Sequence, residues 1–437
     1  MRGEDTPTNF LHRCLEIIDE REGDVHAFVA LDRKGAELAA TKSSARWKTG
    51  IPLSPIDGMP IGIKDVIETA FLPTGQGSAR FAGMRTGRDA AAVFALREAG
   101  AIILGKTVTT EFAATYPGET RNPCDLERTP GGSSSGSAAA VAAGMLPAAL
   151  GTQVVGSITR PASYCGVYGY KPSFGALNRG GCNDQLSQSC LGVLGASLDD
   201  VRAVAVEIAK RVGGDPGHPA LHLSATDDER PTTLAVLELA ASAGIDPAVQ
   251  EAFAVLCKRI QDAGLRLVDR RSDPGLERIE QALFNAFGET RRIVTWESIW
   301  PLREYAGLAD HRLSAQMLAR VQEGRSLTPA DYLAALTKRN AVRVLANEVL
   351  GGYDAVISLA ATGVAPIGIA STGNPGQNVA ASYLGAPVVS LPTMHVGGLP
   401  LGLQVMGRPG DDSALLAVAS QLESLLAIKK TVANLCP

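Results

Sequence analysis

The stretch PGGSSSGSAAAVAAGMLPAALGTQVVGS, residues 130–157, carries the pattern that decides the fold. A loop rich in Gly and Ser leads into an Ala-rich helix, SAAAVAAGM, which is followed by a strand-like segment, LPAALGTQV. Upstream, the helical pattern DAAAVFALREAG runs straight into a short apolar strand, AIIL. Strands and helices that alternate in this way predict an α/β fold, with a central mixed β-sheet flanked by helices on both sides.

The rest of the chain can also be assigned to helices and strands from its sequence pattern. Residues 1–49 read as N-terminal helices, and residues 50–211 read as the first part of the α/β core. Apolar, β-type sequence returns at YDAVISLA, APVVSLP and GLPLGLQVMG, so residues 351–437 are expected to complete the sheet and to end in a last helix. We therefore predict a single domain over residues 1–437.

The variable segment between the two core parts, residues 212–350, is charged and strongly helical. One helix is predicted to begin at Asp246-Pro247 and to stop at Gly264, and a second to begin at Thr328-Pro329. A polar capping residue followed by proline is typical of a helix start. We expect this segment to form a helical layer over the functional site.

Composition excludes several classes of function. The 437 residues carry a formal net charge of −4, so neither nucleic acid nor an anionic membrane surface is an expected partner. The polar start MRGEDTPTNF does not resemble a signal peptide, and no run of about 18 apolar residues predicts a membrane span. Seven cysteines without a CxxC pair indicate neither a disulfide framework nor a zinc site. We expect a cytoplasmic protein with no metal.

One short motif is misleading. The run from Gly100 to Thr107, GAIILGKT, satisfies the P-loop pattern GxxxxGK[ST]. A P-loop follows a strand and opens a helix, whereas here a helix comes first and the middle residues favour a buried strand. We therefore expect no nucleotide site: Gly100 ends a helix and AIIL is a strand.

Two serine-containing turns are the better candidates for chemistry. The loop GGSSSGS, residues 131–137, could be a flexible linker, yet its glycines would also let the backbone approach a reacting group closely. At Gly156-Ser157 a tight turn could expose a hydroxyl while successive N–H groups point at one spot and stabilise an oxyanion. Taken alone, such a Gly-Ser turn is more often only a turn.

A nucleophilic serine needs a base. The six histidines are remote in sequence from both turns, which disfavours a Ser-His-Asp arrangement. Lysine is the other option, provided that burial lowers its pKa. Lys64 lies in MPIGIKDVIET, among apolar residues, and Lys106 and Lys171 share this setting more weakly. The residue pattern alone does not choose between them.

Three motifs in order resemble the amidase signature family: GIKD at residues 62–65, PGGSSSGSAAAVAAG at 130–144 and GTQVVGSITRPASYCGVYGYKPS at 151–173. The similarity extends from about residue 10 to the C-terminal GGLPLGLQVMGRPGDDSALLAVA. Within the family, the SSSGSAAA and S-x-x-R-P patterns are most similar to bacterial malonamidase and carboxybiuret-hydrolase-like members.

The resemblance implies a Ser–cis-Ser–Lys triad without a metal or cofactor. Ser157 would be the nucleophile, Ser133 the bridging serine beside a cis peptide, and Lys64 the base. The N–H groups of Val154, Val155, Gly156 and Ser157 would form the oxyanion hole. The family usually has TGGS or a close variant before the nucleophile, so the two valines are a departure that predicts a narrower or altered pocket.

Substrate contacts are expected around the same turns. Arg160 is either a clamp on a substrate carboxylate or half of an internal ion pair that holds the loop. Gly132 and Ser134 are expected to touch the substrate, with Ser134 also orienting Ser133. Thr152 and Gln153 are expected to support the site from behind. Cys165 is interpreted as a buried structural cysteine.

Three functions remain open. The first is hydrolysis of a C–N bond in a small amide through an acyl-enzyme, which releases ammonia or an amine. In the second, the same triad acts on a carbamate, aryl amide, ureido or hydrazide compound. In the third, the chain belongs to a multi-subunit assembly, with the helical middle as its docking surface. A small molecule is the expected partner, and a homodimer would be unsurprising.

Overall fold

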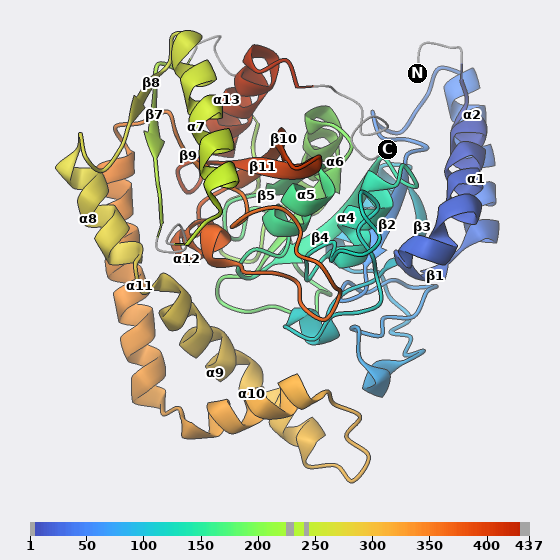
Figure 1. Ribbon diagram of the computed structural model, residues 1–437. Coiled ribbons are helices and arrows are strands. Elements are labelled where there is room, and N and C mark those ends of the chain that lie inside the picture. The colour runs from blue at the N-terminus through green and yellow to red at the C-terminus, as the bar shows by residue number, and fades with distance from the viewer. Residues whose placement is uncertain (1–4, 224–230, 240–243, 429–437) are drawn as a thin grey trace.

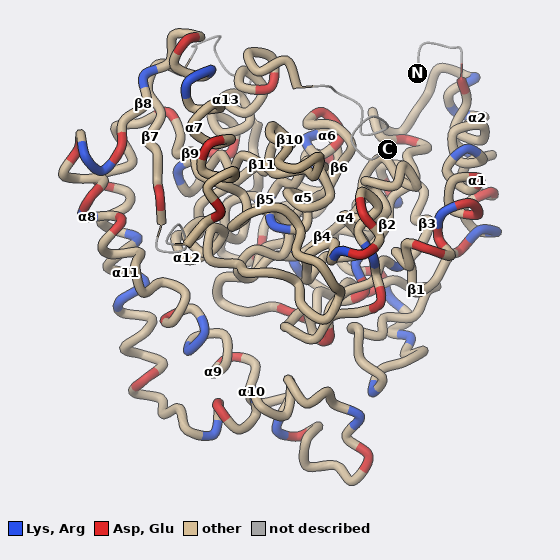
Figure 2. The backbone as a smooth tube through the Cα atoms, viewed as in Figure 1, with Lys and Arg blue, Asp and Glu red and all other residues tan. Residues whose placement is uncertain are grey.

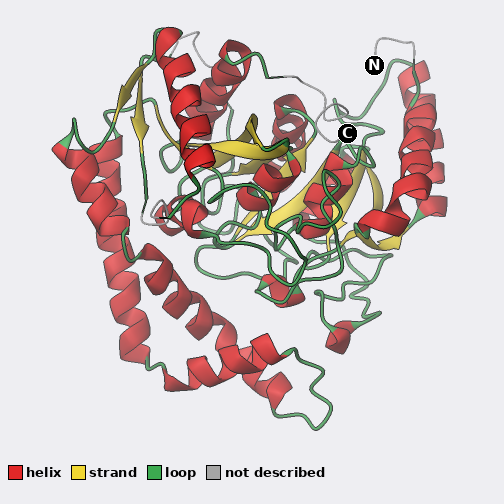
Figure 3. Ribbon diagram, viewed as in Figure 1, coloured by secondary structure: helices red, strands yellow, loops and turns green. Residues whose placement is uncertain are grey.

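The sheet that runs through the molecule has eleven strands in the order β1-β3-β2-β4-β6-β5-β10-β11-β9-β7-β8. The computed structural model describes residues 5–223, 231–239 and 244–428. Figures 1 and 3 show the sheet at the centre, with helices on both faces. The four helices of residues 274–350 form a long arm on one side, which we call the helical arm. The predicted α/β architecture is confirmed.

The strands and helices alternate along much of the chain. The strands are β1 (Phe28–Leu31), β2 (Pro60–Lys64), β3 (Ile102–Thr107), β4 (Ala148–Gln153), β5 (Tyr168–Lys171), β6 (Cys190–Gly195), β7 (Thr233–Val236), β8 (Arg266–Val268), β9 (Ala355–Leu359), β10 (Val388–Val396) and β11 (Leu399–Met406). The α-helices are α1 (Pro7–Val25), α2 (Arg33–Lys48), α3 (Ala91–Glu98), α4 (Ser135–Ala142), α5 (Thr159–Cys165), α6 (Leu198–Val212), α7 (Pro247–Asp262), α8 (Pro274–Leu283), α9 (Ala286–Ala306), α10 (Ala315–Ser326), α11 (Pro329–Leu350), α12 (Val379–Leu384) and α13 (Asp412–Leu425).

The sheet is mixed, and its parallel part positions the candidate site. Strand β2 runs parallel to both β3 and β4, whereas β6, β5, β10, β11 and β9 pair antiparallel in turn. In the β2–β4 pair, Ile61 lies opposite Ala148 and Ile63 opposite Leu150. The carboxyl ends of these two strands therefore lie side by side at one edge of the sheet.

Side chains of each strand alternate between two hydrophobic cores. On β3, Ile103 packs into the core that also contains residues of α3, α6, α7 and α13, whereas Ile102 and Leu104 pack with α1, α2, α4 and α5. A third cluster joins α8, α9, α11 and α12 to β7 and β9. Burial on both faces explains why these strands read as continuous apolar runs.

Three short strands interrupt the regions that were predicted to be helical. In the N-terminal region, β1 lies between α1 and α2 and pairs antiparallel with β3. In the variable segment, β7 and β8 extend the sheet beyond β9. The segment TLAV of β7 is apolar enough to be buried, but it is too short to show a period of its own.

The predicted helix starts of the variable segment are confirmed. In α7 the side chain of Asp246 accepts a hydrogen bond from the N–H of Ala248, and Pro247 is the first helical residue. In α11, Thr328 and Asp331 form a capping box. In Figure 1, α9 and α10 extend below the sheet, away from its edge strands.

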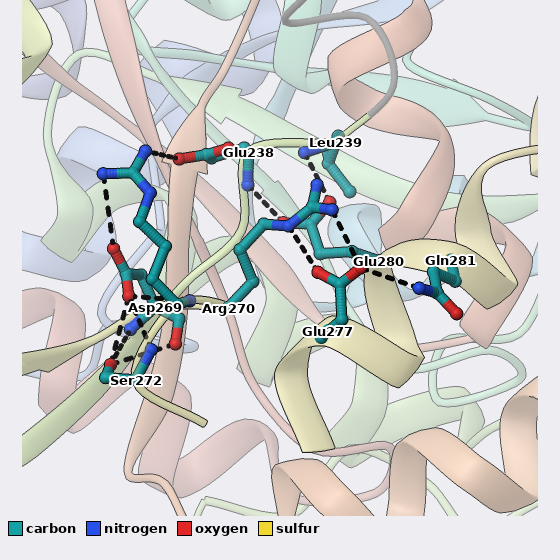
Figure 4. A network of polar contacts seen from close by, with 9 residues as sticks. Glu238, Leu239, Asp269, Arg270, Ser272, Glu277, Glu280 and Gln281 are labelled. Atoms are coloured by element: carbon teal, nitrogen blue, oxygen red, sulfur yellow. Dashed lines mark hydrogen bonds and ion pairs between the residues drawn. The ribbon is translucent and has the colours of Figure 1, made fainter. Parts of the chain in front are cut away.

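A polar network holds α8 against the end of β7. One Glu280 carboxylate oxygen accepts from the N–H of Glu238 at 2.5 Å, and the other accepts from the N–H of Leu239 at 2.8 Å. Beside it, the guanidinium of Arg270 binds both carboxylate oxygens of Glu277, at 2.5 and 3.0 Å (Figure 4). Burial raises the pKa of Glu280. These contacts fix the helical arm to the sheet.

The P-loop-like run is not arranged to bind a phosphate, as predicted. Gly100 lies between α3 and β3, and the Nζ of Lys106 donates to the carbonyl oxygen of Ile67 at 2.8 Å and to Thr74 Oγ1 at 2.8 Å. The same amine lies 3.3 Å from a carboxylate oxygen of Asp65. Lys106 is therefore a buried structural cation.

Charge is distributed evenly over the molecule. Figure 2 shows Lys and Arg residues interspersed with Asp and Glu residues along the helices, without a long run of either sign. Across the described ranges, every helix is too short or too polar to cross a lipid bilayer.

Candidate active site

A cavity of about 1000 Å³ opens between the sheet edge and the helical arm. One wall consists of residues that follow β4, and a second of residues 181–186. The helices α9 and α10 cover it, as expected for the variable segment. The lining residues nearest the candidate chemistry are Val154, Val155, Gly156, Ser157, Arg160, Cys182, Asp184 and Thr372.

Lys64 is the last residue of β2, and its side chain is completely buried. Its Nζ lies 2.8 Å from Ser133 Oγ, 2.8 Å from Thr152 Oγ1 and 3.3 Å from the carbonyl oxygen of Thr152. Thr152 is close because the parallel strands β2 and β4 end at the same edge of the sheet. The structure thus brings Lys64 and Ser133 into direct hydrogen-bonding contact.

Burial changes the acid–base properties of this amine. Desolvation of the ammonium form lowers the pKa of Lys64 to about 8, against the opposing influence of the nearby Asp184 carboxylate. An amine with such a pKa is partly neutral under mildly alkaline conditions, so it can accept a proton. A solvent-exposed lysine would be protonated under the same conditions.

Ser133 lies in the glycine-rich loop that leads into α4. The peptide bond between Gly132 and Ser133 is cis. The carbonyl oxygen of Ser133 accepts a hydrogen bond from the N–H of Thr110 at 3.3 Å. This loop is therefore an ordered part of the core and is not a linker.

Ser157 lines the cavity, in the turn between β4 and α5. Its carbonyl oxygen accepts from the N–H of Ser134 at 3.3 Å, which connects this turn to the loop that carries Ser133. In the described part of the chain, the N–H groups of Val154, Val155, Gly156 and Ser157 donate to no protein acceptor.

Buried polar side chains hold the turn in place. Strand β4 ends at Gln153, slightly earlier than the predicted strand segment LPAALGTQV. It ends there because the carbonyl oxygens of Val154 and Val155 bind side chains and not a neighbouring strand. The carbonyl oxygen of Val154 accepts from Gln188 Nε2 at 2.9 Å, and that of Val155 from Ser382 Oγ at 2.8 Å. The Oε1 of Gln153 accepts from the N–H of Ile158 at 2.8 Å, in the supporting role that was expected for Gln153.

Arg160 is a buried cation without an acidic partner among the described residues. Its Nη2 donates to the carbonyl oxygen of Gly132 at 2.7 Å and to Thr372 Oγ1 at 3.0 Å. Its Nε and Nη1 are buried and have no protein partner in the part of the chain that is described. Desolvation lowers the pKa of Arg160 to about 10. The internal ion pair, one of the two predicted alternatives, is therefore not formed within these residues.

The other candidate bases are not at this site. None of the six histidines lines the cavity. The Nζ of Lys171 donates to the carbonyl oxygen of Pro172 at 2.8 Å, and Lys106 is bound to Asp65. The residue pattern did not choose among Lys64, Lys106 and Lys171 as the base. Of these three lysines, only Lys64 contacts a candidate serine in the structure.

Two of the expected substrate contacts need correction. Neither Gly132 nor Ser134 lines the cavity. Ser134 is fully buried, and its Oγ donates to the carbonyl oxygen of Thr152 at 3.2 Å. Gly132 offers its carbonyl oxygen to Arg160. Both residues support the loops from behind, and Cys165 is a buried free thiol as predicted.

Several residues at the site carry no signal in the sequence. Asp184 lies in a polar loop that reads as an ordinary turn, yet it contacts Thr152 across 32 positions of the chain. Gln188 and Ser382 reach the carbonyl oxygens of Val154 and Val155 across 34 and 227 positions of the chain. No local pattern predicts such contacts, because they depend on how β4, β6 and α12 pack.

Comparison with known proteins agrees with the fold. The Amidase family profile matches residues 9–416. A glutamyl-tRNA(Gln) amidotransferase subunit from Chloroflexus aggregans is 32% identical over 95% of this chain and 92% of its own length. A crystal structure of an amidase superposes with a TM-score of 0.83 at 27% identity, covering 97% of this chain and 96% of the other. A second solved structure, from a vestigial complex related to an s-triazine catabolic enzyme, superposes with a TM-score of 0.85 at 25% identity. This match covers 98% of this chain and 97% of the other.

These matches span nearly the whole chain and include the glycine- and serine-rich segments that form the candidate site. The chain therefore belongs to the amidase signature family and is an amidohydrolase, an enzyme that cleaves amide-type C–N bonds.

Proposed function

We propose that this chain hydrolyses a C–N bond in a small amide through an acyl-enzyme intermediate on Ser157. The observation that carries the proposal is the 2.8 Å contact between the amine of Lys64 and the hydroxyl of Ser133. The loop that carries Ser133 is joined to the turn that bears Ser157 by the hydrogen bond from the N–H of Ser134 to the carbonyl oxygen of Ser157. A buried lysine beside one serine, with a second serine in the cavity, provides a base, a proton relay and a nucleophile.

The proposed reaction begins with neutral Lys64. Its lone pair takes the proton of the Ser133 hydroxyl while Ser133 takes the proton of the Ser157 hydroxyl. The Oγ of Ser157 then bonds to the substrate carbonyl carbon, and the free N–H groups of residues 154–157 stabilise the oxyanion. When the C–N bond breaks, the leaving nitrogen receives a proton through Ser133. Water then attacks the acyl-enzyme by the same route in reverse and releases the acid.

We further propose that the substrate carries a carboxylate. The buried guanidinium of Arg160 lines the cavity and keeps Nε and Nη1 without protein acceptors in the described chain. Because a buried donor without a partner is unfavourable, a bound anion would satisfy these groups. This supports the first of the three functions over neutral carbamates, aryl amides and hydrazides.

A second candidate function has its own support. The relatives with 31–32% identity are subunits of an amidotransferase, as their names state. Phe284, between α8 and α9, and Trp300, within α9, are 72% and 76% exposed, as a docking surface would require. In this alternative, the chain releases ammonia within an assembly and is weakly active alone.

One experiment separates the two candidates. Purified chain and the Ser157→Ala variant are assayed for ammonia release from short amides with and without a carboxylate, including glutamine. Turnover by the chain alone that disappears in Ser157→Ala supports the hydrolase, and a preference for the acidic amides supports the role of Arg160. A folded chain that is inert on every amide rejects the independent hydrolase and favours the role within an assembly.

A further inference from the structure

A buried carboxylate, Asp184, approaches the candidate base through one intervening hydroxyl. The hydroxyl of Thr152 donates to Asp184 Oδ2 at 2.5 Å, and the same oxygen lies 2.8 Å from the Nζ of Lys64. Asp184 is only 6% exposed. The three groups form a continuous chain from carboxylate to hydroxyl to amine.

The single hydrogen of Thr152 fixes the direction of this chain. A threonine hydroxyl has one hydrogen to donate, and here it is committed to the carboxylate. Thr152 Oγ1 can therefore only accept from Lys64. The carbonyl oxygen of Thr152, 3.3 Å from the amine, can also only accept.

A neutral lysine amine has two hydrogens and one lone pair. If both hydrogens are directed to the two Thr152 oxygens, the lone pair is left for the third neighbour, Ser133 Oγ at 2.8 Å. Ser133 must then donate its proton to the amine, which is the direction needed for general-base catalysis. Without an acceptor at position 184, the Thr152 hydroxyl could rotate and donate to the lone pair itself.

We propose that Asp184 is a positioning residue, which holds the Thr152 hydroxyl hydrogen and so directs the lone pair of Lys64 at Ser133. This inference rests on the proposed function of Lys64 as the base. It assigns no direct contact between Asp184 and the reacting atoms.

The charges around Lys64 determine the expected pH effect. Besides Asp184, the thiol of Cys182 is close, and burial raises the pKa of this thiol, so it is neutral. Lys106 on the adjacent strand is paired with Asp65, which follows Lys64. Asp184 is thus the charged group that favours the ammonium form of Lys64, and its removal should lower the pKa of Lys64 further.

The test uses phenylmethanesulfonyl fluoride, which needs no knowledge of the substrate. The rate of Ser157 sulfonylation is followed against pH by intact mass, and the labelled residue is identified by peptide mapping. In Asp184→Leu, which removes the acceptor, the plateau of the pH–rate profile should fall on the order of 10²-fold, as expected for impaired general-base catalysis. The acid limb of the profile should also move to lower pH, because the carboxylate charge is lost. A shifted limb with an unchanged plateau rate would show only this effect of charge and would reject the positioning role.

Variants of Thr152 keep the test decisive if Asp184→Leu does not fold. Thr152→Ser retains the hydroxyl and should label much faster than Thr152→Val. In the Thr152→Val background, Asp184→Leu should reduce the plateau rate little further, because the hydroxyl that Asp184 orients is absent. Asp412→Leu removes another buried carboxylate, which binds Tyr170, and should leave the acid limb at its wild-type position.

The outcomes separate this inference from the proposed function. If Ser157 of the folded wild type is not labelled, or is labelled equally fast without Lys64, the proposed function itself fails. If labelling depends on Lys64 but Asp184→Leu keeps the wild-type plateau rate, the role of Asp184 is rejected. Equal rates in Thr152→Ser and Thr152→Val would also reject it.

Discussion

The amine of Lys64 and the hydroxyl of Ser133 are 2.8 Å apart although 69 positions separate them in the chain. The parallel strands β2 and β4 produce this contact, because they end beside the loop that leads into α4. A completely buried amine in contact with a hydroxyl is suited to proton transfer.

The rate of hydrolysis should rise with pH through the pKa of Lys64. Because desolvation lowers this pKa to about 8, the amine is mostly protonated below that pH and mostly neutral above it. Only the neutral form can accept the proton of Ser133. A plot of kcat/KM against pH should therefore show an acid limb centred near 8. A rate that is constant between pH 6 and pH 9, or that falls over this range, would contradict the role of Lys64.

Replacing the base should remove most of the activity without unfolding the chain. Lys64→Met fills the same buried site without an amine, and its kcat should be about 10²- to 10⁴-fold lower, which is the range for loss of a general base. Thermal unfolding followed by circular dichroism serves as the control for folding. A folded Lys64→Met variant with near wild-type kcat would exclude this lysine as the base.

Arg160 should discriminate between acidic and neutral substrates. In Arg160→Met, kcat/KM for an amide with a carboxylate should fall about 10- to 100-fold, since a hydrogen bond to a charged group contributes roughly 1.5–3 kcal/mol. The neutral amide of similar size is the matched control, because any distortion of Gly132 affects both substrates. Equal losses for the two amides would show that Arg160 has only a structural role.

Val154 should limit the size of the acyl group. This side chain lines the cavity and is 8% exposed, beside the N–H groups that would hold the oxyanion. Val154→Ala enlarges the cavity there and should raise kcat/KM for branched acyl groups relative to acetyl. Loss of two buried methyl groups should lower the free energy of unfolding by about 1–2 kcal/mol. An unchanged ratio of the two substrates would mean that the acyl group lies elsewhere.

Removal of metal ions should have no effect on the reaction. Activation of Ser157 through Ser133 and Lys64 needs only a neutral buried amine, so dialysis against EDTA should leave kcat and KM unchanged. The dialysed protein supplemented with Zn²⁺ is the control. Activity that is lost on dialysis and restored by the metal would require a different mechanism.

The sequence predicts those parts of the fold that depend on local pattern. Apolar residues around Lys64 indicate its burial, and Pro247 and Pro329 mark two helix starts that the structure confirms. The residues between Gly100 and Lys106 indicate a strand, which correctly excludes a phosphate-binding loop. In each case the determining interactions lie within a few residues of one another.

Long-range contacts are what the sequence does not predict. Asp184 is one polar residue in a polar loop, and only the packing of that loop against β4 brings it to Thr152. That Arg160 meets no acidic partner within the described ranges is likewise a property of the assembled structure. The strands β7 and β8 are missed because they are short and lie in charged sequence.

The most direct test of the central claim is to label the nucleophile covalently. Phenylmethanesulfonyl fluoride should form a bond between Ser157 Oγ and sulfur with loss of fluoride, while the serine proton passes through Ser133 to Lys64. The account predicts one adduct per chain, located at Ser157 by peptide mapping, with a rate that falls sharply in Lys64→Met. A folded chain with no adduct, or with an adduct at another residue whose rate does not depend on Lys64, would contradict it.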